Sequence, residues 1–451
     1  MLTEYLAPNR DILKIRPITI DTTGHSPDDA LTYKEGISIT PYVYYYDLQI
    51  PLEGIRTMTL DSTGMLPTLD MSFIDKTGIM SDDALPGDNF IITVRIPPMA
   101  EKILAPVQMD FKILTYTYQE TGAERLFHMT GVCNVDSMFL EPFRGYAKKS
   151  SWEVLRAIAA EAGLGFRSNV PGTQDRMNWV NPGRTPVSFI EDTVLPHAWN
   201  GEASYMWAYV DMYYNLTYVD VEKALQKDIK DQKGVLTNNA FALTDPEGEV
   251  APIYLTTDPS GKMAGHYIST PTVSNNSTMT SLRNGYYKDA HFYDRTGNWS
   301  SRAGSFMQFT VDSITTPGAH EKSLILKGMP GDAKFFKENR GKVYAGRIDT
   351  TNVHPDYAYA VVQNEQNLVD LQKVTMTASL PNVNMNLYRF MKIPVIFSYM
   401  HKPNAATGQI NERLSGQWLI TGVIFTYSST DHFEQHVQMV KRELNVKDFT
   451  A

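Results

Sequence analysis

Cysteine is almost absent from this sequence, since only Cys133 occurs among 451 residues. One thiol cannot form an intrachain disulfide, and it cannot build a zinc site of several cysteines within one chain. Cys133 also lies within an apolar stretch, where a thiol is usually buried and unreactive. The shortage of cysteine excludes a disulfide-stapled fold and fits assembly in a reducing cytoplasm.

Long apolar runs are missing as well. No stretch approaches the roughly 20 apolar residues that cross a bilayer as a helix. The beginning of the chain lacks the apolar core of a secretory signal, because it carries charges at Glu4, Arg10, Asp11, Lys14 and Arg16. We therefore expect a soluble protein that is not exported by a standard signal and does not insert into a membrane.

Positive charge is in deficit, with a formal net charge of −9 and a pI near 5.6. An excess of negative charge repels phosphate, so binding of nucleic acid to the outer surface is disfavoured. The lining of a channel can differ in sign from the whole molecule. A neutral or acidic lining would let DNA pass without trapping it, and the net charge is compatible with such a lining.

Motifs of nucleophilic catalysis and phosphate binding are also lacking. The sequence has no Gly-x-Ser-x-Gly elbow and no Gly-x4-Gly-Lys-Ser/Thr loop. The pairs Asp82-Asp83 and Glu191-Asp192 could supply the acid and base of a lysozyme-like site. However, Asp82-Asp83 precedes Pro86-Gly87, which is typical of a solvated turn, and Asp192 falls on the outer face of a predicted helix. The sequence predicts no catalytic residues, no cofactor and no enzyme.

Histidine and tryptophan offer two further candidate sites. His432 and His436 lie four residues apart, which on a helix would direct both rings toward one metal ion. Their neighbours fit a strand at least as well and no acidic partner is evident, so we expect a solvated strand face and no metal site. Trp179, Trp199 and Trp207 could form a platform for sugar rings, although core or interface anchors are the more common role.

The residues that are abundant favour β structure. With 25 tyrosines and 25 prolines among 451 residues, we expect a strand-rich and loop-rich protein of two to four domains. Residues 1–145 contain strand patterns over 41–51, 90–96, 111–118 and 127–135. Turn-forming residues separate these strands, and no helical period lies between them. The segment therefore predicts an antiparallel sheet or a β-barrel.

The pattern changes in residues 146–204, which we predict to be a small α/β insertion with two short helices. Ser150 and Glu153 form the signature of a capping box, and apolar residues at helical spacing follow as far as Gly163. A second helix is predicted to begin at Thr185-Pro186 and to end before Pro196. Its buried face should consist of Val187, Ile190 and Val194.

The rest of the chain is again predicted to be rich in β structure. Residues 205–219 form a very aromatic strand or hairpin, and residues 205–365 as a whole are expected to continue as an irregular β region with long loops. Residues 366–451 regain clear strand patterns, over 369–379, 387–399, 418–427 and 433–440. Their rhythm is similar to that of residues 1–145. The predicted fold class is mainly β (α+β), with two similar β-barrels in one chain.

Several short motifs occur in an order that is typical of one known family. The strand Phe127-His128-Met129-Thr130-Gly131 precedes Ser150-Ser151-Trp152-Glu153, Gly163-Leu164-Gly165-Phe166, Asp175-x3-Trp179 and Pro186-x2-Phe189-Ile190. Pro381-Asn382-Val383, Leu387-Tyr388 and Leu414-Ser415-Gly416-x-Trp418 follow near the end. In this order the motifs resemble the central baseplate hub proteins of contractile-tailed phages, which are related to the first part of type VI secretion spike proteins. The resemblance covers residues 127–219 and 366–443.

The resemblance implies a structural virion protein with two tail-tube-like β-barrels. Three copies would present six barrels to the sixfold tail tube and a threefold face to the central spike. The implied partners are therefore two further copies, the spike below, the tube or tube-initiator protein above and the surrounding baseplate wedge proteins. Phage DNA would pass through the lumen without specific binding. The implied location is the tail baseplate of the virion, assembled in the host bacterial cytoplasm.

Two other functions are compatible with the sequence. One is a carbohydrate-binding or peptidoglycan-degrading tail component, which would need a carboxylate pair beside a cleft. The other is a sixfold tube-initiator ring protein. Stoichiometry separates this last function from a hub, because a hub is present in three copies and a tube ring in six.

Overall fold

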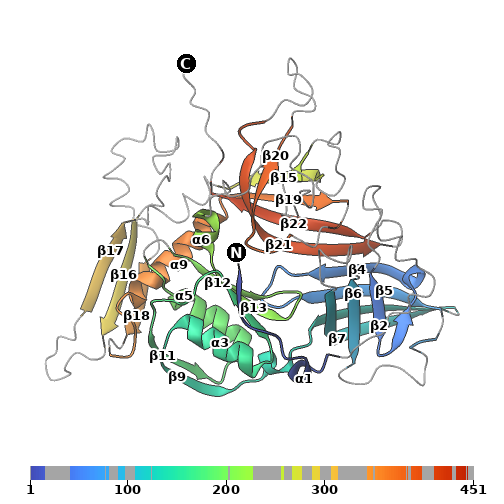
Figure 1. Cartoon of the computed structure of the whole chain (residues 1–451), viewed down its shortest axis with the longest axis horizontal. Coiled ribbons are helices and arrows are strands. Elements are labelled where there is room, and N and C mark those ends of the chain that lie inside the picture. Colours follow the sequence, from blue (N-terminus) through green and yellow to red (C-terminus); the bar gives the residue numbers. More distant parts are fainter. Residues whose placement is uncertain are drawn as a thin grey trace, which may run out of the picture.

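The computed structural model describes residues 2–15, 41–76, 78–80, 90–96, 107–122, 124–201, 204–226, 255–257, 267–276, 287–294, 306–312, 343–348, 351–381, 383, 387–398, 411–428, 433–442 and 444. Strands dominate this part of the chain, and the helices are few and mostly short. Figure 1 shows a large sheet from both ends of the chain beside a smaller α/β unit. The prediction of a mainly β protein is confirmed.

The N-terminal half of the large sheet comes from the predicted strand region of residues 1–145. Its strands run in the spatial order β4-β5-β8-β7-β6-β2-β3, and all neighbours are antiparallel. Their bounds are β2 Tyr42–Tyr45, β3 Leu48–Ile50, β4 Ile55–Asp61, β5 Thr68–Asp75, β6 Ile91–Ile96, β7 Val107–Thr121 and β8 Glu124–Cys133. A 3₁₀ turn, η3 Leu52–Gly54, links β3 to β4. The predicted strands at 90–96, 111–118 and 127–135 are present at slightly different bounds, whereas 41–51 forms the hairpin of β2 and β3.

The C-terminal half of the sheet is built mostly from the predicted strand region of residues 366–451. Its main path is β15-β19-β22-β21, all antiparallel, while β20 flanks β21 and β14 pairs with β20 in parallel. The bounds are β14 Leu255–Thr256, β15 Ser269–Asn275, β19 Val374–Leu380, β20 Lys392–Ile396, β21 Gly416–Ser428 and β22 Glu434–Lys441. This half therefore recruits two strands from the region that was predicted to be irregular.

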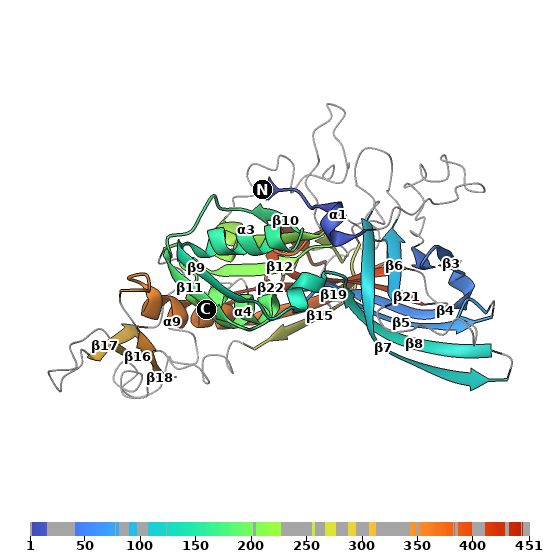
Figure 2. The ribbon, with the colours of Figure 1, turned by 90° about the horizontal axis from the view of Figure 1, so that it is seen from below.

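The two halves are joined into one 13-stranded sheet by antiparallel pairing of β21 with β4. Figures 1 and 2 show these strands side by side, although hundreds of residues separate them in the chain. Among the described strands the main path stays open, with β15 at one end and β3 at the other. No closed barrel is therefore found in the described residues.

The halves repeat one topology. The path β4-β5-β8-β7 corresponds to β15-β19-β22-β21, and in each the last two strands are a long hairpin. The first hairpin strand has a bulge in both halves, between Ile113 and Thr115 in β7 and between Ile420 and Gly422 in β21. Up to the bulge, the outer edge of this strand pairs with the strand that precedes it in the chain. That strand is β6 for β7 and β20 for β21. The similarity in strand rhythm thus reflects a structural repeat.

The smaller α/β unit has a four-stranded sheet in the order β1-β10-β13-β12. It includes β1 and the aromatic hairpin β12–β13, which lie outside residues 146–204, and a separate ribbon pairs β9 with β11. The helix α3 packs on β10 and β13. The bounds are β1 Thr3–Leu6, α1 Arg10–Leu13, η5 Asp136–Phe139, β9 Phe143–Lys149, α3 Ser151–Glu161, β10 Gly165–Ser168, β11 Met177–Pro182, β12 Met206–Val210 and β13 Asn215–Asp220.

The first predicted helix of this unit is confirmed in detail. Ser150 Oγ accepts the amide of Glu153, and the Glu153 side chain accepts the amide of Ser150, which is the predicted capping box. The helix stops at Gly163, whose φ of +73° is unfavourable for residues with a side chain. A Cβ atom there would also lie 2.6 Å from Ile12 Cγ2, so glycine allows α1 to pack closely.

The second predicted helix begins correctly at Pro186 but does not end before Pro196. It continues as α4 Pro186–Phe189, a π turn over Ile190–Val194 and α5 Leu195–His197. A π turn shifts the hydrogen-bond pattern by one residue, which is one way that a helix accommodates a proline without an N–H donor. The buried face also differs from the prediction, because Phe189 is buried with Ile190 and Val194, whereas Val187 is half-buried.

A helix that the sequence did not predict, α9 Tyr357–Leu371, occupies a region that was interpreted as irregular β structure and the start of a strand. That strand begins only at Val374, as β19. Three strands, β16 Tyr287–Asp294, β17 Phe306–Asp312 and β18 Val343–Ile348, form a separate small sheet, and α6 Val221–Gln226 follows β13.

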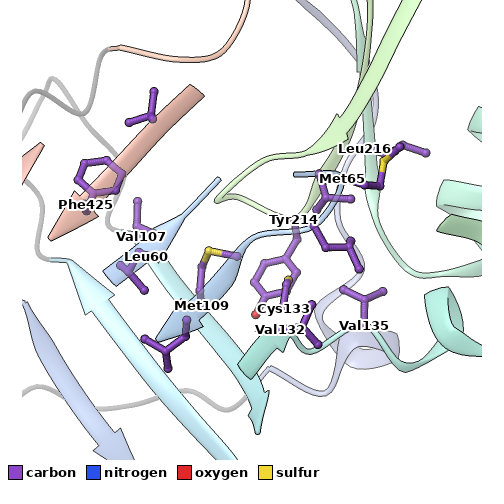
Figure 3. Close-up of a cluster of buried hydrophobic side chains, with 14 of the residues drawn as sticks. Leu60, Met65, Val107, Met109, Val132, Cys133, Val135, Tyr214, Leu216 and Phe425 are labelled. Carbon is purple, nitrogen blue, oxygen red and sulfur yellow. The ribbon is translucent and has the colours of Figure 1, made fainter. Parts of the chain in front are cut away.

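The main hydrophobic core includes buried side chains of both the large sheet and the α/β unit. In β5, Leu69, Met71 and Phe73 alternate with more exposed residues, and Phe73 stacks on Phe127 of β8 at 5.3 Å between ring centroids. Full burial of each such side chain stabilises the fold by about 1.5–3 kcal/mol. Figure 3 shows Tyr214 of the aromatic hairpin against Cys133 and Met109 of the sheet. The hairpin therefore anchors the α/β unit to the N-terminal half.

Candidate functional site: the polar face and central joint of the sheet

The joint between the two halves is a continuous stretch of antiparallel pairing. Ile424 faces Asp61, Thr426 faces Thr59 and Ser428 faces Thr57. Beyond the paired residues, the buried Ser62 hydroxyl donates to the Val423 carbonyl at 2.6 Å. Gly422 has no side chain at the point of closest approach, where a Cβ would lie 2.5 Å from Thr63 Cγ2. The joint is thus packed and hydrogen-bonded like the interior of a sheet.

Arg389 ties the joint to the α/β unit. Its guanidinium donates to the Gly64 carbonyl at 2.6 Å, in the β4–β5 connection, and to the Thr421 carbonyl of β21 at 2.8 Å. It lies 4.5 Å above the ring centroid of Tyr209 in β12, whose hydroxyl donates to the Arg389 carbonyl. Burial lowers the pKa of Arg389 to about 10, so the side chain stays charged at neutral pH. Three parts of the molecule therefore meet at one cation.

The face of the sheet opposite the core is polar across the joint. Directly paired side chains of antiparallel strands share a face, so the register defines its members. Hydroxyl groups dominate, and several bond across strands, as in Thr57 with Ser72 at 2.7 Å and Thr115 with Thr130 at 2.6 Å. The polar face comprises Thr272, Ser274, Thr375, Thr377, Ser379, Glu434, His436, Gln438, Ile424, Thr426, Ser428, Thr57, Thr59, Asp61, Thr68, Asp70, Ser72, His128, Thr130, Thr115, Thr117 and Gln119.

The charges on this polar face are mostly negative. Asp61, Asp70 and Glu434 lie on it, whereas Lys112 at its margin is paired with Asp136 at 2.6 Å. The same side of the sheet becomes apolar near the beginning of β21 and the end of β22. There Leu419 and Val440 pack with tyrosines of the β12–β13 hairpin. One end of the face is therefore covered by the α/β unit, and the rest presents hydroxyls and carboxylates.

The α/β unit is held rigid by a buried carboxylate, Asp175. Its oxygens accept hydrogen bonds from the amide of Ser151 at 2.9 Å, the hydroxyl of Thr173 at 2.6 Å and the amide of Trp199 at 2.9 Å. The Ser151 hydroxyl also bonds to the buried Tyr218 hydroxyl of β13 at 2.7 Å. These contacts explain the Asp175-x3-Trp179 motif structurally: the aspartate fixes the start of α3 and the end of the second helix.

Helix α9 docks on the second helix through polar side chains. Asn364 donates to the carbonyls of residues 195, 196 and 198, and Gln363 donates to the Ser204 carbonyl at 2.7 Å. At the start of α9, Tyr357 stacks on His197 at 4.2 Å, and His354 bonds to the His197 carbonyl at 3.0 Å. Burial lowers the pKa of His197 from 6.5 to about 4 and lowers that of His354 as well.

The histidine and tryptophan candidates that the structure describes pack against or bond to neighbouring elements. His436 lies on β22, where its ring bonds to Ser379 at 2.7 Å and Thr426 at 2.9 Å on the polar face, while His432 lies outside the described residues. Trp179 and Trp199 are buried and cannot stack on a sugar ring, and Trp207 packs near Phe390. The anchor interpretation is confirmed for Trp179 and Trp199.

Of the two carboxylate candidates, only Glu191-Asp192 lies in the described residues. Asp82-Asp83 lies outside them. Glu191 and Asp192 are both exposed on the π turn, and Asp192 is 3.5 Å from Arg184. Desolvation, with a smaller contribution from Asp192, raises the pKa of Glu191, a shift that the sequence did not predict. The Cys133 thiol is buried in β8 as predicted, and burial raises its pKa far above the ordinary range.

Two kinds of feature are absent from the described residues. No group of three or more His, Cys, Asp or Glu side chains there could hold a metal ion. No helix among those same ranges is long and apolar enough to cross a bilayer. The residues that stand out are instead those of the joint and the polar face.

Comparisons with known proteins agree with this architecture. No model of a known family matches the sequence, and no curated protein is similar to it. A tail protein from Neisseria meningitidis superposes with a TM-score of 0.50 at 10% identity, covering 90% of this chain and 97% of that one. The 43 kDa tail protein of prophage MuSo2 from Shewanella oneidensis superposes with a TM-score of 0.52 at 8% identity, covering 89% and 98%. The chain has the fold of a phage tail protein.

The tail-protein fold extends over nearly the whole chain, so the large sheet and the α/β unit are both part of it. An Escherichia coli component of the type VI secretion system superposes with a TM-score of 0.42 at 9% identity, covering 91% of this chain and 80% of that one. The signals for the tail-protein fold were the motifs around α3 and the second helix. Arg389, Asp61 and Asp70 had no such signal, because single polar residues within strand patterns do not reveal which strands pair.

Proposed function

We propose that this chain is the trimeric hub of a contractile phage tail baseplate, a structural virion protein that joins the sixfold tube to the threefold spike. One observation carries the proposal: the chain contains two half-sheets of the same topology, joined edge to edge by β21 and β4. In this proposal residues 1–145 supply one tube-like unit, and residues 366–451, completed by part of 205–365, supply the second. Residues 146–204 are the α/β insertion. Three copies would then supply six similar units.

The repeat also specifies how one copy would meet the next. In the C-terminal half, the outer edge of β21 pairs with β20 before its bulge and with β4 after it. In the N-terminal half, β6 covers β7 before the equivalent bulge, and no described strand pairs with the edge at residues 117–121. The strand equivalent to β4 is β15, which pairs only with β19 among the described strands. We therefore propose that β7 of one copy pairs with β15 of its neighbour.

Register follows from the repeat. When the two halves are aligned by their strand pairs, Gln119 corresponds to Thr426, and Thr272 corresponds to Thr59. Thr426 and Thr59 face each other in the internal joint. Gln119 of one copy should then face Thr272 of the next, on the polar face. Three copies would close a ring by a heterologous contact, which also covers two strand edges that no described strand covers.

The polar face would line the lumen of this ring. This lining consists of hydroxyls with Asp61, Asp70 and Glu434, and the residues that define it include no lysine or arginine. It therefore offers phosphate few groups to bind. DNA could then pass without specific binding. The spike, the tube or tube-initiator protein and the wedge proteins remain the proposed partners, in a virion assembled in the host cytoplasm.

A disulfide trap tests the proposal. The double variant Gln119→Cys/Thr272→Cys should form intermolecular disulfides on mild oxidation, because directly paired residues have Cβ atoms about 4.5–5.5 Å apart. Buried Cys133 should not interfere. We expect cross-linked dimers and trimers on non-reducing gels and no larger species. Native mass spectrometry should give three times the 50.9 kDa chain mass.

The matched control is Gln119→Cys/Thr377→Cys. Thr377 lies on the strand behind Thr272, about 5 Å further away. This variant should stay monomeric on the gel. Equal cross-linking of both variants, or a sixfold mass, would reject the register and the trimer.

A further inference from the structure

The ribbon of β9 and β11 presents an apolar surface that the trimer proposal leaves unused. Four of the ten large hydrophobic side chains exposed in the described residues lie on it or lead into it: Phe139, Leu140, Phe143 and Val180. Phe143 is the most exposed of them, with 78% of its surface accessible. A soluble protein rarely leaves such side chains together on its surface unless they meet a partner.

The register places Phe143 and Val180 on one face of the ribbon. Phe143 pairs with Pro182, and Gly145 pairs with Val180, so all four residues point to the same side. Along β11, Val180 and Pro182 are exposed while Trp179 and Asn181 are buried, which identifies this side as the outer one. A Cβ built on Gly145 would meet nothing within 4 Å. The outer face is therefore flat, apolar and open.

The same ribbon ends in a free strand edge. β9 pairs only with β11 among the described strands, and it forms the lower border of the molecule in Figure 1. Every second residue of an antiparallel edge strand points its backbone N–H and C=O groups away from its partner. Six of the seven residues of β9 are exposed. Such an edge is able to accept one more strand.

The charge of β9 indicates which kind of segment it would bind. β9 carries Arg144, Lys148 and Lys149 and no acidic residue, in a chain with a net charge of −9. Arg144 and Lys149 have acidic neighbours, Glu161 at 3.9 Å and Glu153 at 3.4 Å. No ion pair of Lys148 occurs within the described residues. The edge is thus locally basic, and it complements an acidic segment.

We infer that the β9–β11 ribbon is a docking site for an extended segment of another protein, in which acidic and apolar residues alternate. The segment would add a strand to the β9 edge, place its apolar side chains on Phe143 and Val180 and direct its carboxylates to the cations of β9. A strand edge recognises a polypeptide backbone, which neither nucleic acid nor a lipid surface possesses. The inference goes beyond the proposed hub role, in which the ring uses β7 and β15 and leaves β9 for a peripheral protein.

A synthetic peptide provides the probe. A fluorescent ten-residue peptide of alternating valine and glutamate is titrated into the full-length protein and followed by anisotropy. A second peptide replaces glutamate by lysine, and a third carries proline at two central positions, which prevents strand pairing. We expect the lysine peptide to bind at least about tenfold more weakly. The proline peptide should not bind measurably.

Variants locate the site. Phe143→Ser and Lys148→Glu should each weaken binding of the glutamate peptide several-fold, whereas Leu48→Ser, which removes another exposed apolar side chain on β3, should not. Amide hydrogen exchange should show new protection in residues 143–149 only. Each variant should keep the native mass of the unmodified protein, which separates this test from a failure of the trimer.

Other outcomes would overturn the inference. Equal binding by the Phe143→Ser variant, or protection elsewhere, would place the peptide at another site. Tighter binding of duplex DNA or of anionic phosphatidylserine vesicles, lost in Lys148→Glu, would assign the basic edge to nucleic acid or membrane. Loss of the oligomer in Phe143→Ser would make the ribbon a contact between copies of this chain.

Discussion

At the scale of single residues, Arg389 concentrates more contacts between parts of the molecule than any motif in the sequence suggested. Its guanidinium donates hydrogen bonds to carbonyls in β21 and in the β4–β5 connection, and it lies over the ring of Tyr209 in β12. Removal of the guanidinium deletes two hydrogen bonds from a charged donor, to the Gly64 and Thr421 carbonyls. A hydrogen bond to a charged group contributes about 1.5–3 kcal/mol to stability.

We predict that Arg389→Ala lowers the free energy of unfolding by about 3 kcal/mol or more. Arg389→Lys should recover only part of this loss, because an ammonium group cannot reach both carbonyls in a fixed fork. Urea denaturation followed by tryptophan fluorescence measures the change. The exposed Arg413→Ala is the control and should stay within about 0.5 kcal/mol. A similar midpoint for Arg389→Ala and Arg413→Ala would contradict the role of Arg389.

At the scale of elements, the contact of α9 with the second helix depends on neutral histidines. The folded pKa of His197 is about 4, below its ordinary value of 6.5. Above pH 6.5 the ring is neutral in both states. Between pH 6.5 and about 4 the unfolded state binds a proton that the folded state does not, so folding loses stability as the pH falls. Burial also lowers the pKa of His354, whose ring bonds to the His197 carbonyl.

We predict that His197 alone reduces the free energy of unfolding by about 3 kcal/mol between pH 6.5 and pH 4. His197→Phe keeps a ring against Tyr357 and removes the titration, so its stability should fall less over this range. Buried Asp211 and Asp220 have raised pKa values and act in the opposite direction, so the informative quantity is the difference between the two proteins. His128→Gln, on the exposed polar face, should keep the original profile. Parallel profiles for His197→Phe and the unmodified protein would refute the prediction.

The elements also show how far the sequence alone could lead. Strands whose apolar residues alternate, such as β5, and the capping box of α3 were predictable, because local pattern and tertiary burial agree there. Helix α9 was not, because its buried face includes Gln363, Asn364 and Asn367. These amides bind carbonyls of the second helix and the loop after it, so no apolar period marks the helix. Polar docking surfaces of this kind are invisible to hydrophobic patterning.

Strand pairing was the other part that the sequence could not supply. The pattern indicated two similar strand regions, but it did not indicate that β21 pairs with β4 or that β15 belongs to the C-terminal half. β15 contains Pro271 and few apolar residues, so its strand character depends on the neighbouring β19. The polar face depends on that pairing, and its members could be recognised only from the register.

At the scale of the whole molecule, the polar face makes a prediction about DNA. The triple variant Thr59→Lys/Asp70→Lys/Thr130→Lys places three ammonium groups in one cross-strand row. We expect this variant to bind duplex DNA at low salt, with affinity falling steeply as salt rises, while the unmodified protein does not bind. Electrophoretic mobility shifts at several salt concentrations measure this.

A control separates position from net charge. Two threonines and one aspartate changed to lysine add four positive charges, and Asp47→Lys/Glu53→Lys adds the same four on the exposed β2–β3 region. The control should bind DNA far more weakly if the polar face encloses a channel that concentrates the added charges. Equal binding by the two variants would show that the polar face has no special exposure to DNA.

The fusion of two half-sheets in one polypeptide has a consequence for how a ring would form and evolve. A ring of six separate subunits has six identical seams, each made by collision of two molecules. Here every second seam forms within one chain as it folds. The polypeptide that connects β4 and β21 keeps the two edges at a high effective concentration. Only the seams between chains would then depend on protein concentration. The two kinds of seam are also encoded by different residues, so mutation can weaken one kind and leave the other intact.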